Sequence, residues 1–343
     1  MPFIRDPTQS TKALIEGSAL SPRFSNFSIF QANYKTVGDH GIRADFMIPK
    51  SLRAGEKVPV ITQFHGGGLI FGDSLYSPWF PIWVLELAEK HNAVIACANY
   101  RMMPESTAVE VLSDIDDWWR WLHSSDSANL LAALPTPIEL DLDRVITTGE
   151  SAGGLLSVYL AMTYPEDIRA ATAGYPMFNQ DGPVETDQTP ALAPQIPESA
   201  LLELQKTINA GNTVSSDDSD LRMALFHSFF RTKALLFKCY DRDSLASPVH
   251  RERLYQLQRL EQPDTKLPLG GLVILHGAQD PVVPVTLSER FVNAAREKLR
   301  GRQGADNIVL SIQEGVHGFD NTFSIEEPWL KEALATAISR WLE

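Results

Sequence analysis

The feature that most constrains the fold is a regular alternation of short apolar segments with longer amphipathic ones. Segments rich in Val, Ile and Ala predict buried strands at residues 58–64, 93–100, 144–148 and 168–175. The amphipathic segments predict helices at residues 79–90, 109–123 and 154–163. Strands that are apolar on both faces and separated by helices indicate an α/β fold, with a mostly parallel sheet flanked by helices.

Two further segments, at residues 30–36 and 41–48, alternate apolar and polar side chains across a glycine-containing turn. This pattern predicts an antiparallel pair at one edge of the sheet. The first 25 residues are otherwise polar and irregular, with one short helical candidate at residues 11–17.

The alternation stops between about residues 179 and 268 and then resumes. This stretch contains several prolines and a predicted helix at residues 221–238 that is rich in Met, Leu and Phe. Such a helix fits the core of a second lobe, and it also fits a cap whose aromatic face lines a pocket for an apolar substrate. The resumed pattern predicts strands at residues 272–275 and 307–313 and helices at residues 285–299 and 328–342.

An alternation of strands and helices that is interrupted once and then resumes indicates one domain with an insertion. We therefore expect residues 1–343 to form a single domain. Its core would comprise about residues 26–180 and 268–343, and a helical cap about residues 180–268. Residues 1–25 are a further candidate contribution to the cap.

Composition excludes several classes of protein. The formal net charge of -13 leaves no basic surface for a phosphate backbone, so we expect no nucleic-acid partner. The two cysteines, Cys97 and Cys239, have no ligand-spaced neighbours, so neither a disulfide framework nor a metal site is expected. The sequence contains no run of 18 apolar residues, so we expect no membrane span. The N-terminal residues lack an uninterrupted apolar segment, so we expect no signal peptide. The expected location is the cytoplasm.

The pentapeptide Gly149-Glu150-Ser151-Ala152-Gly153 fits the pattern G-x-S-x-G. Alone this match is weak, but an apolar strand precedes it and an apolar helix follows. That context is the one required by a nucleophile elbow, in which a sharp turn presents the serine hydroxyl. Glycines are needed because the turn crowds the neighbouring backbone.

A serine hydroxyl needs an oriented base to become a nucleophile near neutral pH. His317 and Asp280 each follow directly on one of the last two predicted strands, in the chain order Ser, Asp, His that the elbow fold uses. His276 is a rival base and Asp320 a rival acid. His276 precedes Asp280 and ends its own strand, and we interpret it as structural. Asp320 follows His317 too closely for the usual geometry.

The run His65-Gly66-Gly67-Gly68 follows the strand at residues 58–64. Successive glycines after a strand allow two backbone N–H groups to point at one place, as an oxyanion hole requires. A phosphate-binding loop is the alternative, but neither Lys-Ser/Thr nor a complete G-x-G-x-x-G follows. We interpret His65 as a structural residue that braces the loop.

Together these motifs resemble the alpha/beta-hydrolase fold-3 family, the hormone-sensitive-lipase-like serine esterases. A further motif is the segment 99–105, Asn-Tyr-Arg-Met-Met-Pro-Glu, which is similar to the family's N-Y-R-L-x-P-E, and Asp114 matches an acidic position in the helix that follows. The resemblance covers roughly residues 55–180 and 270–340, and the expected cap has no motif to match.

The resemblance implies a role for six residues. By position, Ser151 matches the nucleophile, Asp280 the triad acid and His317 the base. The N–H groups of three residues match the oxyanion hole: Gly67, Gly68 and Ala152.

The family also implies a function. It hydrolyses carboxylic esters through a covalent acyl-enzyme and needs no cofactor, and apolar cap residues favour a small hydrophobic ester. Homodimers are frequent in the family, but no segment of this sequence identifies an interface. The alternatives are acyl transfer or thioester cleavage on a biosynthetic intermediate, for example a polyketide, with the same triad. A prolyl-type peptidase and a non-catalytic receptor or lyase on the same scaffold are further alternatives.

Overall fold

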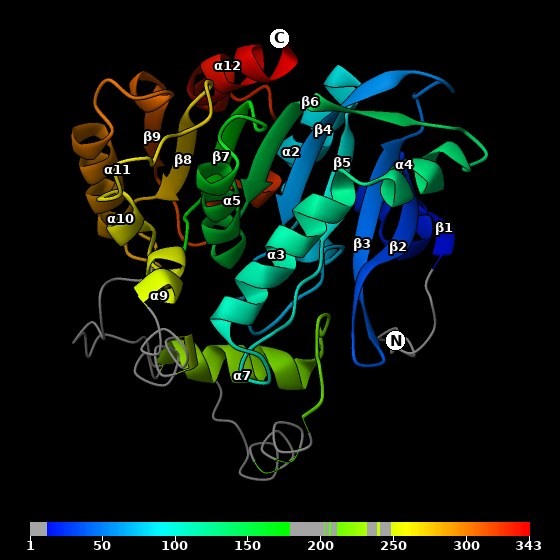
Figure 1. The fold of residues 1–343 in the computed structure, drawn as a ribbon, viewed down its shortest axis with the longest axis horizontal. Helices are drawn as coiled ribbons and strands as arrows, with labels where there is room; N and C mark the ends of the chain where they lie inside the picture. The colour runs from blue at the N-terminus through cyan, green and yellow to red at the C-terminus, as the bar shows by residue number, and fades with distance from the viewer. Residues whose placement is uncertain (1–11, 179–201, 203–205, 207–210, 232–238, 241–247) are drawn as a thin grey trace.

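A single mixed sheet forms the centre of the computed structural model, which describes residues 12–178, 202, 206, 211–231, 239–240 and 248–343. Within those ranges nine strands follow the spatial order β1-β2-β3-β5-β4-β6-β7-β8-β9 (Figure 1). Their bounds are β1 Lys12–Glu16, β2 Phe27–Val37, β3 His40–Pro49, β4 Lys57–Phe64, β5 Val94–Ala98, β6 Glu139–Gly149, β7 Ala170–Gly174, β8 Leu272–Gly277 and β9 Ile308–Gln313.

Strand direction divides the sheet into two parts. The pairs β1–β2, β2–β3 and β3–β5 are antiparallel, whereas β5, β4, β6, β7, β8 and β9 are mutually parallel. The mostly parallel sheet with an antiparallel edge is therefore confirmed. Parallel order matters for function because it brings the carboxyl ends of the central strands to one edge, where sites on such sheets form.

Helices cover both faces of the sheet. Buried residues of α2 (Ile82–His91) and α12 (Pro328–Leu342) belong to the core on one face. Those of α3 (Ala108–Leu122), α5 (Ala152–Thr163) and α11 (Val285–Lys298) belong to the core on the other face. Figure 1 shows α3 and α5 in front of the central strands.

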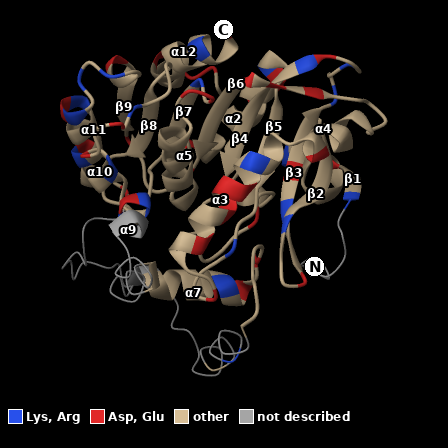
Figure 2. Cartoon of the chain, viewed as in Figure 1, with Lys and Arg blue, Asp and Glu red and all other residues tan. Residues whose placement is uncertain are grey.

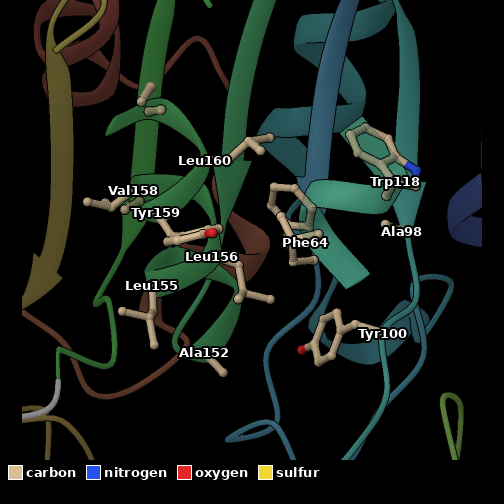
Figure 3. Packing of buried hydrophobic residues seen from close by; sticks show 14 of the residues in the cluster. Phe64, Ala98, Tyr100, Trp118, Ala152, Leu155, Leu156, Val158, Tyr159 and Leu160 are labelled. Carbon is tan, nitrogen blue, oxygen red and sulfur yellow. The ribbon is translucent and has the colours of Figure 1, made fainter. Parts of the chain in front are cut away.

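The core beside the site packs around the last residue of β4. Phe64 lies between α3 and α5, with the ring of Trp118 in an edge-on contact at 5.8 Å (Figure 3). Helix α3 begins with a capping box, since Thr107 accepts from the N–H of Glu110 and the Glu110 carboxylate accepts from the N–H of Thr107. Helix α5 carries no charged residue and almost all of it is buried.

The shorter helical elements complete the described part of the chain. The α-helices are α1 Gly17–Leu20, α4 Ser125–Ala132, α7 Asp220–Arg231, α9 Pro248–Leu254 and α10 Gln256–Arg259. The 3₁₀ turns are η1 Pro22–Phe24, η2 Ser77–Trp79, η4 Ala305–Asn307 and η5 Phe319–Thr322. The segment expected as a cap is described only at α7, α9, α10 and the short stretches beside them. Most of its residues from 179 to 210, and residues 232–238 and 241–247, lie outside the described residues.

The helix predicted at residues 11–17 is wrong for the part that is described. Lys12–Glu16 forms the edge strand β1, which pairs with β2 in the register Lys12↔Ala32 to Glu16↔Ser28. The propensity of this short segment for helix is weak compared with the pairing that β2 offers. These residues therefore extend the sheet, whereas residues 1–11 lie outside the described ones.

Charged side chains are absent from several strands and one helix at the centre of the fold. Figure 2 shows acidic and basic residues over α3, α7 and α11, while α5, β7 and β8 contain neither. None of the helices in the described ranges combines the length and the apolar character needed to cross a bilayer.

Candidate active site

The turn between β6 and α5 has the backbone geometry of a nucleophile elbow. Ser151 adopts φ 56° and ψ -115°, a conformation that L-residues rarely accept. A Cβ on Gly149 would lie 2.3 Å from the Gly153 carbonyl oxygen, and one on Gly153 would lie 2.0 Å from that of Phe64. Both positions therefore require glycine, which explains the spacing of the motif.

The loop after β4 approaches this elbow. Gly67 and Gly68 have φ of 93° and 64°, and a Cβ on Gly67 would lie 1.8 Å from the carbonyl oxygen of Phe71. In the described part of the chain the N–H groups of these two glycines donate to no backbone carbonyl. The N–H of Ala152, at the first position of α5, has no intrahelical acceptor either. Three unused donors thus lie close to the serine turn.

The segment after β5 supports the loop. The Tyr100 ring stacks on the His65 imidazole, with centroids 4.4 Å apart and planes 8° apart, and its hydroxyl donates to the His65 carbonyl oxygen over 2.7 Å. Asn99 accepts from the N–H of Ser74 over 3.0 Å. Arg101 makes a bidentate pair with buried Asp114. The segment 99–101 therefore holds the loop, and it contributes no side chain to the lining of the cavity.

His317 and Asp280 are brought together from the ends of β9 and β8. Nδ1 of His317 lies 2.7 Å from Oδ2 of Asp280. Oδ1 of Asp280 accepts from the N–H groups of Val282 and Val283 over 2.8 and 2.9 Å. Burial raises the pKa of Asp280, but hydrogen bonds from His276 and His317 outweigh burial and hold this pKa well below its usual range.

The two rival residues make their shortest hydrogen bonds elsewhere, although Nε2 of His276 also lies 3.5 Å from Oδ2 of Asp280. His276 is fully buried, with Nδ1 2.8 Å from the Ser288 hydroxyl and Nε2 2.9 Å from the Val283 carbonyl oxygen. Asp320 is also fully buried and accepts from the indole N–H of Trp83 over 3.0 Å. The hydrogen bond from His317 goes to Asp280.

A cavity of about 290 Å³ opens in front of the elbow. Ser151, His317 and Gly67 all line it, whereas Gly68, Ala152 and Asp280 do not. The Ser151 hydroxyl is buried and has no hydrogen-bond partner among the described residues. Three of the six predicted residues therefore line one cavity, and Asp280 is joined to it through its hydrogen bond with His317.

Several further lining residues were not predicted as site residues. They come from β4, η2 and the residue before it, the end of β7, α7 and η5, and they are Gln63, Tyr76, Trp79, Tyr175, Phe226, His227 and Asn321. The signal for Gln63 and Tyr175 was their position at the carboxyl ends of predicted strands. Trp79 and Phe226 carry no such signal, because only the folded chain brings their rings to 6.0 Å.

Two buried carboxyl groups lie beside the serine turn. Burial and the charge of Asp320 raise the pKa of Glu150 well above its ordinary value, although a hydrogen bond from Gln63 lowers it. Burial also raises the pKa of Asp320. A Cβ on Gly174 would lie 3.3 Å from Cγ of Glu150 and 3.7 Å from Oδ2 of Asp320, so both side chains pack over this glycine.

The described residues hold no group of three or more His, Cys, Asp and Glu side chains that could bind a metal ion. Cys97 is buried and Cys239 half-buried, and the two are not joined by a disulfide.

Comparisons with known proteins identify similar sequences and one matching family. A sequence model of the family described as alpha/beta hydrolase fold matches residues 61–256. The probable carboxylesterase M8 of a Phoma species is 26% identical over 332 residues, which are 93% of this chain and 98% of that protein. The non-reducing polyketide synthase ausA of Aspergillus calidoustus is 25% identical over 315 residues, which are 81% of this chain and 12% of that protein.

Solved structures share the same architecture. An esterase of Pyrobaculum calidifontis superposes with a TM-score of 0.56 at 19% identity, covering 95% of this chain and 88% of that one. At this identity the likeness concerns the fold.

Proposed function

The chain belongs to the alpha/beta-hydrolase fold-3 family, and from that premise we propose that it is a serine esterase that cleaves carboxylic esters of small hydrophobic molecules. The observation that carries the proposal is the joint placement of Ser151 and His317 on one cavity, with Asp280 bonded to the far nitrogen of the imidazole.

The proposed reaction is a two-step acyl transfer. Because Nδ1 of His317 is engaged by Asp280, Nε2 is the nitrogen available to accept the Ser151 proton. Ser151 Oγ then attacks the ester carbonyl carbon, and His317 returns the proton to the leaving alcohol. Water repeats the sequence on the acyl-enzyme and releases the acid. A serine without a hydrogen bond to its base is common in free enzymes, because the contact tightens with substrate.

The proposed reaction develops a positive charge on His317 and a negative charge on the ester oxygen, and each charge has its own stabilising groups. Asp280, whose pKa is held well below its usual range, stays ionised and stabilises the imidazolium that forms on His317. The unused N–H groups of Gly67, Gly68 and Ala152 would hold the oxyanion. Loss of one such donor typically costs about 2.7–4 kcal/mol of transition-state stabilisation.

The substrate follows from the lining of the cavity. Tyr76, Trp79 and Phe226 supply aromatic surface, which fits a hydrophobic ester. We further propose that residues 26–180 and 268–343 form the catalytic core and that the insertion between them covers the site. Helix α7 supports this, because it carries Phe226 and lies below the central strands in Figure 1. No observation favours acyl transfer or thioester cleavage over hydrolysis.

The test is turnover of p-nitrophenyl butyrate by the wild-type chain and by Ser151→Ala. The proposal expects wild-type hydrolysis and a loss of about 10⁴-fold or more in the variant. Circular dichroism checks that the variant is folded. Comparable turnover by a folded Ser151→Ala chain would refute the assignment.

A further inference from the structure

The cavity has two unlike walls. Tyr76, Trp79 and Phe226 form one wall, which we call the aromatic wall: the ring centroids of Tyr76 and Trp79 lie 5.1 Å apart, and those of Trp79 and Phe226 lie 6.0 Å apart. The other wall is polar and comes from the carboxyl ends of β4 and β6, where Gln63, His65 and Glu150 line the cavity. We call this second set the polar wall.

Each residue of the polar wall has a buried polar atom without a partner. Gln63, His65 and Glu150 are 2%, 9% and 5% exposed. Gln63 Oε1, His65 Nε2 and Glu150 Oε1 form no hydrogen bond within the described residues. A buried polar group left unpaired costs about 1–3 kcal/mol, so three around one small cavity indicate a ligand that pairs with them.

The hydrogen bonds that these residues do make determine which of their atoms remain available to a ligand, and whether each atom is a donor or an acceptor. Gln63 Nε2 donates to Glu150 Oε2 over 2.7 Å, so the free atom of the Gln63 amide is its oxygen, an acceptor. His65 Nδ1 lies 2.8 Å from the Gly66 carbonyl oxygen, to which it donates, so Nε2 is the acceptor of a neutral ring. Burial supports neutrality, because it lowers the pKa of His65 to about 4.

Glu150 supplies the complementary donor. Burial, first, and the charge of Asp320 raise the pKa of Glu150 well above its ordinary value, which favours the protonated carboxyl. Since Oε2 accepts from Gln63, the proton belongs on Oε1, the free atom. The polar wall therefore presents two acceptors and one donor.

We propose that the polar wall binds a hydroxyl group of the substrate, so that the preferred esters carry both an aromatic group and a hydroxyl. A hydroxyl donates and accepts at once, and so matches both kinds of atom. An ammonium group only donates and would face the Glu150 proton, whereas a carboxylate would face two acceptors. This inference rests on the proposed esterase function and names the substrate class for the same site.

The test compares three p-nitrophenyl esters of 3-phenylpropanoic acid: the unsubstituted acid, its 2-hydroxy derivative and its 3-hydroxy derivative. Each kcat/KM is divided by the rate of alkaline hydrolysis of the same ester, which removes intrinsic reactivity. We expect the normalised kcat/KM of at least one hydroxylated ester to exceed that of the unsubstituted ester by about tenfold or more. Sites that form hydrogen bonds to a substrate hydroxyl discriminate strongly against analogues that lack it. Equal normalised values for all three would overturn the inference.

Variants assign the preference to the polar wall. Gln63→Met and Glu150→Leu should each bring the ratio between hydroxylated and unsubstituted ester close to one. Glu150→Gln keeps an acceptor for Gln63 and an N–H donor, and so should retain the preference. Phe226→Leu, on the aromatic wall, is the matched control and should lower kcat/KM for all three esters by a similar factor.

The outcomes separate the two proposals. If Gln63→Met and Glu150→Leu lower the normalised kcat/KM of all three esters by the same factor, the polar wall serves only the fold and the inference fails. If Gln63→Met does not fold, the comparison of Glu150→Leu with Glu150→Gln decides in the same way. If the wild-type chain hydrolyses none of the three esters or p-nitrophenyl butyrate, the proposed function itself fails.

Discussion

Nδ1 of His317 lies 2.7 Å from Oδ2 of Asp280, and two backbone N–H groups hold the other oxygen of that carboxylate. The backbone bonds and the His317 bond fix the carboxylate from both ends. The imidazole is thereby held with Nε2 as its free nitrogen. This arrangement favours one tautomer of the histidine, the one that the proposed proton transfer requires.

Replacement of the carboxylate should expose this role. Asp280→Asn retains the shape but donates an N–H to Nδ1, so Nε2 carries the proton and cannot accept one. We expect kcat for p-nitrophenyl butyrate to fall about 10³–10⁴-fold, with a much smaller change in KM. Steady-state kinetics measure both.

Asp320→Asn is the matched control, because this carboxylate is bonded to Trp83 rather than to His317. Its effect on kcat should remain below about tenfold. If Asp320→Asn lowers kcat as much as Asp280→Asn does, the assignment of Asp280 as the triad acid is contradicted.

Stability should respond to pH through Glu150. Its pKa is raised on folding above the ordinary 4.5, so its protonated form contributes stability below that pH, and this contribution is lost as pH rises through the folded value. Glu150→Gln stays neutral throughout. The unfolding free energy of wild type relative to the variant should therefore fall above pH 4.5, by up to about 1.4 kcal/mol per pH unit.

Urea denaturation at a series of pH values from 4 to 8 supplies the comparison. Parallel curves for wild type and Glu150→Gln would mean that the carboxyl titrates alike in the folded and unfolded states.

Helix α7 is attached to the core by a buried ion pair. The Arg222 guanidinium donates to both oxygens of Glu105 over 2.9 and 2.7 Å, with side chains 4% and 1% exposed. Glu105→Gln leaves the arginine charge buried without its counter-charge and should lower the unfolding free energy by about 3–5 kcal/mol. Glu105→Leu combined with Arg222→Met should recover most of that loss, because no buried charge remains.

The exposed pair Lys298–Glu261 is the control for this experiment. Glu261→Gln should change stability by less than about 1 kcal/mol. If Glu105→Gln is equally mild, then the ion pair does not hold α7 on the core.

The central sheet could be predicted from sequence because strands that are buried on both faces leave an apolar signature in the chain itself. The elbow and the glycine loop could be predicted for a similar reason. Gly149 and Gly153 are required by contacts within a few residues or with the adjacent strand, so the constraint appears directly as a motif.

Other features depend on distant partners and leave no local trace. The Lys12–Glu16 segment becomes a strand because β2 offers an edge to pair with, which its own residues do not reveal. The aromatic wall joins η2 to α7, and the polar wall joins β4 to β6. Their residues are ordinary in the sequence, and only the crossing of the chain over the carboxyl edge of the sheet makes them a site.

The most direct measurement of the central claim is covalent labelling with an organophosphonate ester, followed by mass spectrometry of the digested protein. The account predicts one phosphonyl group per chain, on Ser151, because the reagent imitates the tetrahedral intermediate and requires an activated hydroxyl. Labelling should be absent in Ser151→Ala and at least about 10³-fold slower in His317→Ala. A label on another residue, or undiminished labelling of His317→Ala, would contradict it.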